Sequence, residues 1–282
     1  MRVLVTGASG FIGSYVTKFL PSYHSLVSLS RTPSPNRIEA DLLVFDVDDF
    51  SELLKKQQIE GILHLAAEGN VSNCEHFKDA HSLNVRVTEK LVEAAKKKKI
   101  PIIFSSTDQV FPGDAGQLYE STSPNPCHQY GRQKCQAEQV VLGYALGSVL
   151  RLPLVLGLHR QGKGVLESML SQGRATGFLN LFVDEFRRPI HARDAAKALW
   201  TAFEWKPGLY HIPGPELMSR MKIAQEAVNA LEEKTIKLVP VSYKEHNFGY
   251  TRPGNLDLAS SEQVVTDLRL GSFAQNLTDL LY

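Results

Sequence analysis

Tyr130 and Lys134 are the residues of this chain whose spacing most directly indicates acid–base chemistry. Residues four apart on a helix share one face, so the ammonium group would lie beside the phenol. A nearby positive charge lowers the pKa of a tyrosine. Tyr130 could then donate a proton to a carbonyl oxygen as hydride arrives, or accept one in reverse. Among the nine tyrosines, only Tyr130 has a lysine four residues later.

Three hydroxyl side chains lie upstream of this pair. Ser105, Ser106 and Thr107 end the apolar run "PIIFSST", and Thr107 precedes Tyr130 by 23 residues. Ligands of a parallel sheet bind beyond the carboxyl ends of its strands. A hydroxyl group at that edge could hold a substrate carbonyl beside the tyrosine.

The segment "VTGASGFIGSYV" carries Gly7, Gly10 and Gly13 directly after an N-terminal apolar run. Gly7 would make a tight turn, Gly10 would let the backbone approach a pyrophosphate, and Gly13 would let the following helix pack closely. The free N–H groups and dipole of the helix N-terminus attract phosphate. The segment therefore predicts a dinucleotide site, and the alternative is a plain packing turn.

The end of the second apolar run bears on the choice of cofactor. An Asp or Glu there would bind the ribose 2′-hydroxyl of NAD, but the sequence reads "SLSRTPSP", with Arg31 in that place. Arginine suits a 2′-phosphate, so we expect NADP, with NAD as the alternative cofactor and a solvated loop arginine as the alternative reading. After the third run, Asp46 and Val47 stand where adenine could lie.

Elements that could position these residues alternate along the first half of the chain. Continuous apolar runs are typical of buried parallel strands, and their alternation with helical patterns predicts a doubly wound α/β sheet. The expected strands are 2–6, 25–30, 42–46, 61–67, 101–106 and 148–157, and the expected helices are 10–20, 49–57, 77–99 and 128–146.

The pattern changes after residue 157. Short strands at "FLNLFV", "GLYHIPG" and "TIKLVPV" alternate with expected helices at 192–205 and 219–232. We therefore expect a dinucleotide-binding domain over 1–157 and a smaller mixed α/β substrate domain over 158–282. The second domain would be discontinuous, with the segment 190–205 returning to the first.

Composition narrows the functional classes. The 282 residues have a net charge of +1, which gives no field to attract nucleic acid or an anionic membrane. No apolar run reaches the roughly 20 residues of a membrane span. Three cysteines and no leader-like segment favour a cytoplasmic protein. The cysteines and histidines fit no standard metal-ligand spacing, so no metal is expected.

Together these motifs resemble a known superfamily. "TGASGFIG", "HLAA", "SLNV", "SSTDQVF", "YGRQK" and "LRLPLVLG" resemble the extended short-chain dehydrogenase/reductases. "STDQVF", "SPNPCHQYG", "GLYHIPGPELMSR" and "RPGNLDLASSE" are similar to the dTDP-4-dehydrorhamnose reductase group within that branch. The resemblance covers nearly the whole chain. It implies a seven-stranded Rossmann domain and reduction of a 4-keto nucleotide sugar, and it allows a homodimer.

The resemblance also assigns roles to individual residues. The implied catalytic set is Thr107, Tyr130 and Lys134. The implied cofactor contacts are Gly7, Gly10, Phe11, Ile12, Gly13, Arg31, Asp46, Val47, Leu65, Ala66, Ala67 and Lys134, with backbone near Ser105 and Pro153 approaching the nicotinamide.

The sequence departs from this group at places that bear on substrate. "STDQVFPG" lacks an aromatic residue that the group has beside the active site, and Arg187 and Arg188 replace smaller residues. Facing the cavity, this arginine pair could grip a diphosphate bidentately; facing outward, it would be surface charge. Epimerases and dehydratases share the tyrosine–lysine pair, although Asp108 lacks the following Glu that dehydratases need. The NADP-binding regulatory β subunit of methionine adenosyltransferase resembles the same group, so a binding role is the alternative to catalysis.

Overall fold

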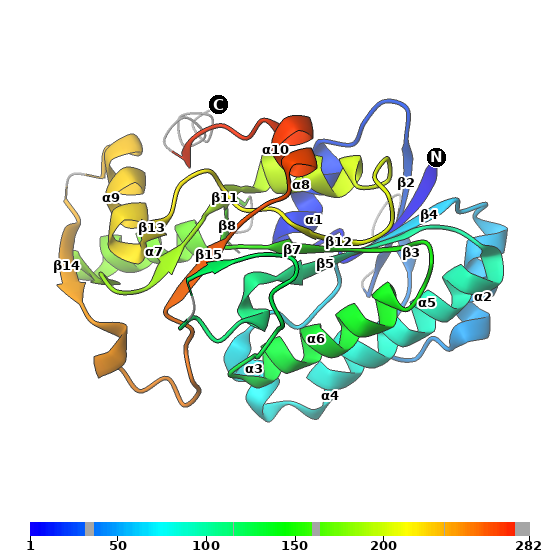
Figure 1. Cartoon of the computed structure of the whole chain (residues 1–282), viewed down its shortest axis with the longest axis horizontal. Coiled ribbons are helices and arrows are strands. Elements are labelled where there is room, and N and C mark those ends of the chain that lie inside the picture. Colours follow the sequence, from blue (N-terminus) through cyan, green and yellow to red (C-terminus); the bar gives the residue numbers. More distant parts are fainter. Residues whose placement is uncertain (32–36, 115, 160–163, 234, 274–282) are drawn as a thin grey trace.

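The computed structural model describes residues 1–31, 37–114, 116–159, 164–233 and 235–273. Its centre is a seven-stranded parallel sheet in the order β12-β7-β5-β4-β1-β2-β3 (Figure 1). The strands are β12 (Leu209–His211), β7 (Gly147–Leu152), β5 (Ile102–Thr107), β4 (Gly61–His64), β1 (Arg2–Thr6), β2 (Ser25–Ser30) and β3 (Arg37–Glu39). The order reverses between β1 and β4, so the predicted doubly wound fold is confirmed.

Helices cover both faces of this sheet (Figure 1). On one face α1 (Phe11–Lys18) packs against α8 (Ala192–Thr201), and α10 (Glu262–Leu268) contacts α8. On the other face α2 (Val47–Lys56), α5 (Val87–Lys98) and α6 (Gln129–Leu142) lie side by side. Each layer has its own buried apolar cluster against the sheet. The apolar runs of the central strands are thus buried on both faces, as continuous runs in parallel sheets are.

A second group of elements lies beyond the carboxyl ends of the strands. It contains α7 (Val165–Thr176), β9 (Phe178–Phe182), α9 (Arg220–Ala230) and β14 (Lys237–Val241), which share a third apolar cluster. A four-stranded sheet joins this group to the first; its strands are β13 (Met218–Ser219), β10 (Phe186–Arg187), β15 (Asn255–Leu258) and β6 (Gln117–Leu118). The division between residues 157 and 158 stays a proposal. The segment 190–205, expected to return to the first domain, contains α8, which packs against α1. β12, expected among the short strands of the second domain, pairs instead with β7 in the central sheet.

Three predicted elements differ from the structure. The strand expected at 42–46 is wrong. Asp41 accepts a hydrogen bond from the Leu43 N–H, and Asp46 caps α2 by accepting from the backbone of Asp48 and Asp49. Such local side-chain bonds compete with strand pairing.

The other two differences are interruptions. The helix expected at 77–99 is divided into α4 (Lys78–His81), a π-helical turn (Ser82–Arg86) and α5. The run 148–157 splits into β7 and β8 (Val155–Leu156), with Pro153 between them. Proline has no N–H to donate to a strand partner, which accounts for the break.

Candidate active site

The glycine turn connects β1 to α1. Gly7 has φ = +74°, and a Cβ there would lie 2.6 Å from the Ala66 nitrogen. A Cβ on Gly13 would lie 2.2 Å from the Gly7 oxygen, whereas one on Gly10 would meet only that oxygen, at 3.2 Å. Backbone packing therefore requires Gly7 and Gly13, and space for a ligand is the remaining reason for a glycine at position 10. Among the described residues, no side chain caps the N-terminus of α1, so its first N–H groups can receive an anion.

A cavity of about 520 Å³ lies over this turn. It brings together most of the residues that the sequence assigned to the site. The assigned residues that line the cavity are Gly7, Gly10, Phe11, Ile12, Gly13, Leu65, Ala67, Ser105, Thr107, Tyr130, Lys134 and Pro153. The glycine turn and the tyrosine–lysine pair, more than a hundred residues apart in sequence, thus border one space.

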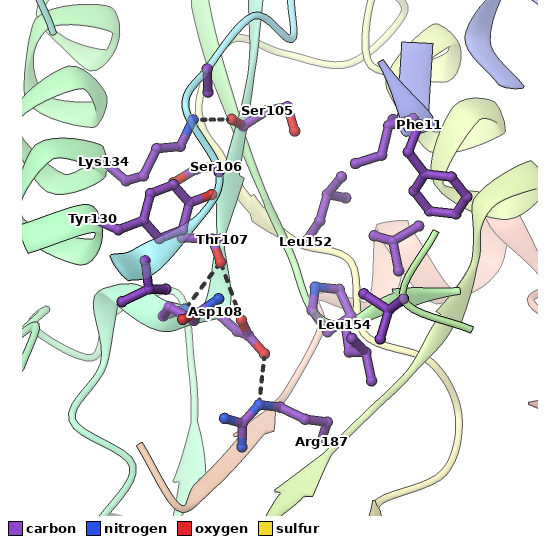
Figure 2. Close-up of a pocket in the computed structure, with 18 of the residues that line it drawn as sticks. Phe11, Ser105, Ser106, Thr107, Asp108, Tyr130, Lys134, Leu152, Leu154 and Arg187 are labelled. Atoms are coloured by element: carbon purple, nitrogen blue, oxygen red, sulfur yellow. Dashed lines mark hydrogen bonds and ion pairs between the residues drawn. The ribbon is translucent and has the colours of Figure 1, made fainter. Parts of the chain in front are cut away.

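Tyr130 and Lys134 reach from α6 toward the end of β5 (Figure 2). The Lys134 Nζ donates to the Ser105 carbonyl at 2.6 Å and lies 3.9 Å from the centre of the Phe104 ring. The Thr107 hydroxyl is at the last residue of β5, on the same side of the cavity. The helical spacing of Tyr130 and Lys134 and the position of Thr107 at the end of β5 therefore bring the three side chains to the same side of the cavity.

Burial is the largest influence on the pKa values of Tyr130 and Lys134. It raises the pKa of Tyr130 above its usual range, and the neighbouring Cys74 and Asp108 add to the rise. It lowers the pKa of Lys134 to about 7, although the Glu138 carboxylate opposes that shift. The expectation that Lys134 would lower the pKa of Tyr130 is therefore not met. The phenol is protonated at neutral pH, which is the form that a proton donor requires.

The Ser106 hydroxyl has a different role. It donates to Glu138 at 2.5 Å, and Glu138 forms a buried ion pair with Arg151 at 2.7 Å. The end of β5 is thereby fixed to α6 and β7 behind the cavity. Among the three hydroxyl residues, Thr107 remains the one assigned to substrate.

The opposite end of the cavity is charged. Glu185 is fully buried, with its oxygens 2.6 Å from Arg252 Nε, 2.8 Å from Arg220 Nε and 3.2 Å from an Arg187 nitrogen. Burial alone would raise the pKa of Glu185, but the charges of Arg220 and Arg187 outweigh burial and lower this pKa to about 2. All three arginines line the cavity. Glu185 and Asp108, which lies 3.7 Å from Arg187, offset two of the three guanidinium charges. One positive charge remains, so this end favours an anion.

The two arginines noted in the sequence separate. Arg187 is buried at the cavity and also lies 3.7 Å from Asp108. Arg188 pairs with Asp257 at 2.5 Å and donates to the Pro215 carbonyl, and it is not among the residues that line the cavity. The arginine group is therefore Arg187, Arg220 and Arg252, not the neighbouring pair.

A second cavity, of about 300 Å³, adjoins the glycine turn on the side of β2. Gly7, Gly10 and Ala66 line it together with the exposed Arg31. Asp46 and Val47 line neither cavity, because they begin α2. Asp41, Leu42 and Leu43 line the second cavity instead. The assignment of Asp46 and Val47 to adenine stays a prediction that neither cavity supports.

A third, mostly apolar cavity of about 140 Å³ continues beyond the arginines. It shares Arg220 and Arg252 with the large cavity, and Phe182 and Asn180 of β9 form part of its wall. The Arg252 guanidinium lies 5.5 Å from the centre of the Phe182 ring and 5.0 Å from that of Phe248. An anion at the arginines could thus carry a flat apolar group into this space.

Arg220, Arg252 and Tyr250 all line the large cavity, although no role was expected for them from the sequence. Two of them stand within motifs that carried the family resemblance, Arg220 after "ELMS" and Arg252 in "TRPGN". Their positions were visible, but nothing in their spacing indicates that they converge on Glu185. Only the folded chain joins the three segments.

Two features are absent from the described part of the chain. Within those ranges, no cluster of three or more histidine, cysteine, aspartate or glutamate side chains is arranged to hold a metal ion. The described helices include none that is both long and apolar enough to cross a membrane.

The parallel sheet, the glycine turn and the tyrosine–lysine pair on α6 define a protein of the extended short-chain dehydrogenase/reductase class. Within that class, the chain belongs to the family described as "RmlD substrate binding domain", whose model matches residues 1–282. The resemblance noted in the sequence is thereby confirmed.

The relatives of this chain include two kinds of protein. The chain is 27% identical over 295 residues to methionine adenosyltransferase 2 subunit beta of Danio rerio, and the alignment covers 100% of this chain and 90% of that protein. It is 28% identical over 280 residues to dTDP-4-dehydrorhamnose reductase of Aggregatibacter actinomycetemcomitans, covering 93% and 92%.

Solved structures share the fold. The structure of dTDP-4-dehydrorhamnose reductase from Bacillus anthracis in complex with NADP superposes with a TM-score of 0.86 at 21% identity, covering 99% of this chain and 98% of that one. At this level of identity, the likeness concerns the fold.

Proposed function

We propose that this protein is an NADP-dependent reductase of a 4-keto nucleotide sugar. The observation that carries the proposal is the single cavity that has the glycine turn and Thr107, Tyr130 and Lys134 at one end and three arginines at the other. Its relatives include dTDP-4-dehydrorhamnose reductases, one of which is structurally known with NADP.

The residues at the turn suit a dinucleotide. Gly10 leaves room for a diphosphate against the N-terminus of α1. Arg31, in the adjoining cavity and without a carboxylate beside it in sequence, suits a 2′-phosphate. Lys134 would bind the nicotinamide ribose. When bound, NADPH supplies the hydride.

The remaining chemistry falls to Tyr130 and Thr107. The Tyr130 phenol holds its proton at neutral pH and can give it to the substrate oxygen as the carbonyl is reduced. Thr107 would donate a hydrogen bond to the same oxygen. Arg187, Arg220 and Arg252 would bind the diphosphate, which arginine recognises bidentately, and the small apolar cavity would receive the nucleoside.

A second candidate is an NADP-binding regulatory subunit. It is favoured by the similarity to methionine adenosyltransferase 2 subunit beta, which extends over the full length of this chain. The cavity described above would then bind a dinucleotide without turnover. Tyr130 would remain in place with no substrate to protonate.

One pair of measurements separates the two. Absorbance loss of NADPH is followed with a panel of 4-keto nucleotide sugars, and in parallel the protein is used to capture partners from a lysate of its source. Turnover of a nucleotide sugar supports the reductase. Tight NADPH binding with no turnover in the panel, together with a retained protein partner, overturns it in favour of the regulatory role.

A further inference from the structure

Asp108 links the two ends of the large cavity. It follows Thr107 in sequence, lines the cavity and is 2% exposed. Its Oδ1 accepts from the Thr107 hydroxyl at 3.2 Å, and its Oδ2 lies 3.7 Å from Arg187 Nε (Figure 2). Oδ2 has no hydrogen-bond partner among the described residues, which is unusual for a buried carboxylate oxygen.

The Thr107 hydroxyl has a single hydrogen. Its oxygen already accepts from the Gln109 N–H at 3.2 Å, and its hydrogen goes to Asp108. While that bond exists, the hydroxyl cannot donate to a substrate oxygen. If Asp108 is protonated, the direction of the bond can reverse, because a neutral carboxyl group can donate to Thr107.

We propose that Asp108 is a positioning residue whose protonation, promoted when a substrate diphosphate engages Arg187, releases the Thr107 hydrogen to the substrate carbonyl oxygen. The inference rests on the proposed function. The proton that Asp108 gains comes from solvent and stays on Asp108. Tyr130 still supplies the proton that the substrate oxygen receives.

The surroundings of Asp108 support this coupling. The charged and titratable groups that face it are Arg187 from β10, Arg220 from α9, Glu185 before β10 and Tyr130 from α6. Burial raises the pKa of Asp108 to about 6, although the charge of Arg187 opposes the rise. A diphosphate on the arginines would offset that charge and add negative charge nearby, and both effects favour the neutral carboxyl group.

Proton uptake on binding tests the proposal without turnover. The probe is dTDP-glucose, whose diphosphate does not titrate near neutrality and which has no ketone to reduce. Binding is measured by calorimetry at pH 7 in buffers of different ionisation enthalpy. We expect the wild type to take up about half a proton or more per site, and Asp108→Asn to bind with none of this uptake.

Asp257→Asn is the matched control, because Asp257 also pairs with an arginine but lies outside the cavity. It should retain the wild-type uptake. Binding by the wild type without uptake, or uptake that persists in Asp108→Asn, overturns the inference and leaves the proposed substrate class standing. Failure of the wild type to bind dTDP-glucose overturns the proposed function, and the inference with it.

The pH profile of kcat gives a second readout that a merely structural role would not change. In the wild type, kcat should fall at alkaline pH where Asp108 ionises in the complex. Asp108→Asn keeps an N–H donor for Thr107, so the part of this fall that comes from Asp108 should disappear while turnover is retained. Any fall that comes from Lys134, whose pKa burial lowers to about 7, should remain in both proteins. A profile identical to that of the wild type would contradict the proposed role.

Discussion

Backbone and small residues line one end of the large cavity, whereas three guanidinium groups line the other. The turn end comes from two short contiguous motifs, residues 5–16 and 130–134 with the preceding strand end. The arginine end comes from β10, α9 and the segment before β15, joined by the buried Glu185. One end depends on local geometry and the other on long-range charge balance.

This difference indicates how each end responds to change. A backbone site tolerates most surrounding substitutions but not an added side chain at its glycine positions. A charge cluster depends on each member, because removing one partner of a buried pair leaves another charge without compensation. Substitutions at the two ends should therefore have different consequences.

Tyr130→Phe should lower kcat by about 10²–10⁴, the usual contribution of a positioned general acid. The variant keeps the ring and loses the proton that matters only during chemistry, so NADPH affinity should change little. Stopped-flow absorbance at saturating NADPH measures the first effect and fluorescence titration the second. Tyr119→Phe, at an exposed tyrosine outside the cavity, is the control, and equal losses in both variants would contradict the assignment.

Gly10→Val should weaken dinucleotide binding by about a hundredfold or more, which corresponds to ~2.7 kcal/mol. The protein should still fold, since a Cβ at Gly10 meets only the Gly7 oxygen at 3.2 Å. Gly13→Val should by contrast lower the thermal midpoint, because its Cβ would overlap the turn. Cofactor fluorescence with circular dichroism would show both results, and wild-type affinity in Gly10→Val would refute the phosphate role of the turn.

Arg252→Ala should weaken binding of dTDP-glucose by about tenfold to a hundredfold, the ~1.5–3 kcal/mol of a charge-assisted contact. NADPH affinity should stay the same, because the arginines line the opposite end of the cavity. Arg188→Ala, whose side chain pairs with Asp257 elsewhere, should leave both affinities unchanged. A parallel loss of NADPH affinity in Arg252→Ala would show that the two ends are not separate.

Arg31→Ala should reduce the preference for NADPH over NADH by about tenfold. This is the low end of what a charge-assisted contact contributes, because Arg31 is exposed. Titration of both cofactors against both proteins measures the ratio. A wild type that prefers NADH, or a variant with unchanged preference, would remove the assignment of Arg31 to a 2′-phosphate.

Buried titratable groups near the two ends of the cavity should also lower the stability of the folded protein in different ranges of pH. Burial lowers the pKa of His64, which lies between Thr6 and Thr88, to about 3. Unfolded histidine gains a proton near pH 6.5, so the free energy of unfolding should fall below that pH by up to ~1.4 kcal/mol per unit. Glu185, with a pKa of about 2, should contribute a further loss only below its unfolded value near 4.5.

Urea midpoints at pH 7.5, 5.5 and 4 would test this order, with His64→Gln as the comparison. Burial also lowers the pKa of His128, to about 4, so the variant should reduce the slope between pH 7.5 and 5.5 without abolishing it. An unchanged slope would show that His64 titrates alike in the folded and unfolded states.

Much of the cofactor end could be predicted because its information is local. Continuous apolar runs identified β1, β2 and β5, and the glycine spacing identified the turn. Helical periodicity placed Tyr130 and Lys134 on one face. The strand expected at 42–46 failed for an equally local reason, since Asp41 and Asp46 bond to the backbone there and favour a turn and a helix start.

The sequence by itself indicated the alternation of strands and helices in a doubly wound sheet, the turn over which a dinucleotide is expected to lie and the pair expected to transfer a proton. Tertiary structure alone decided which arginines share Glu185, that Arg188 points elsewhere, and that Asp108 lies between Thr107 and Arg187. It also decided the protonation of Tyr130, because burial depends on every neighbouring segment. Helical and strand periods act over a few residues, whereas charge pairing and desolvation depend on which distant segments meet.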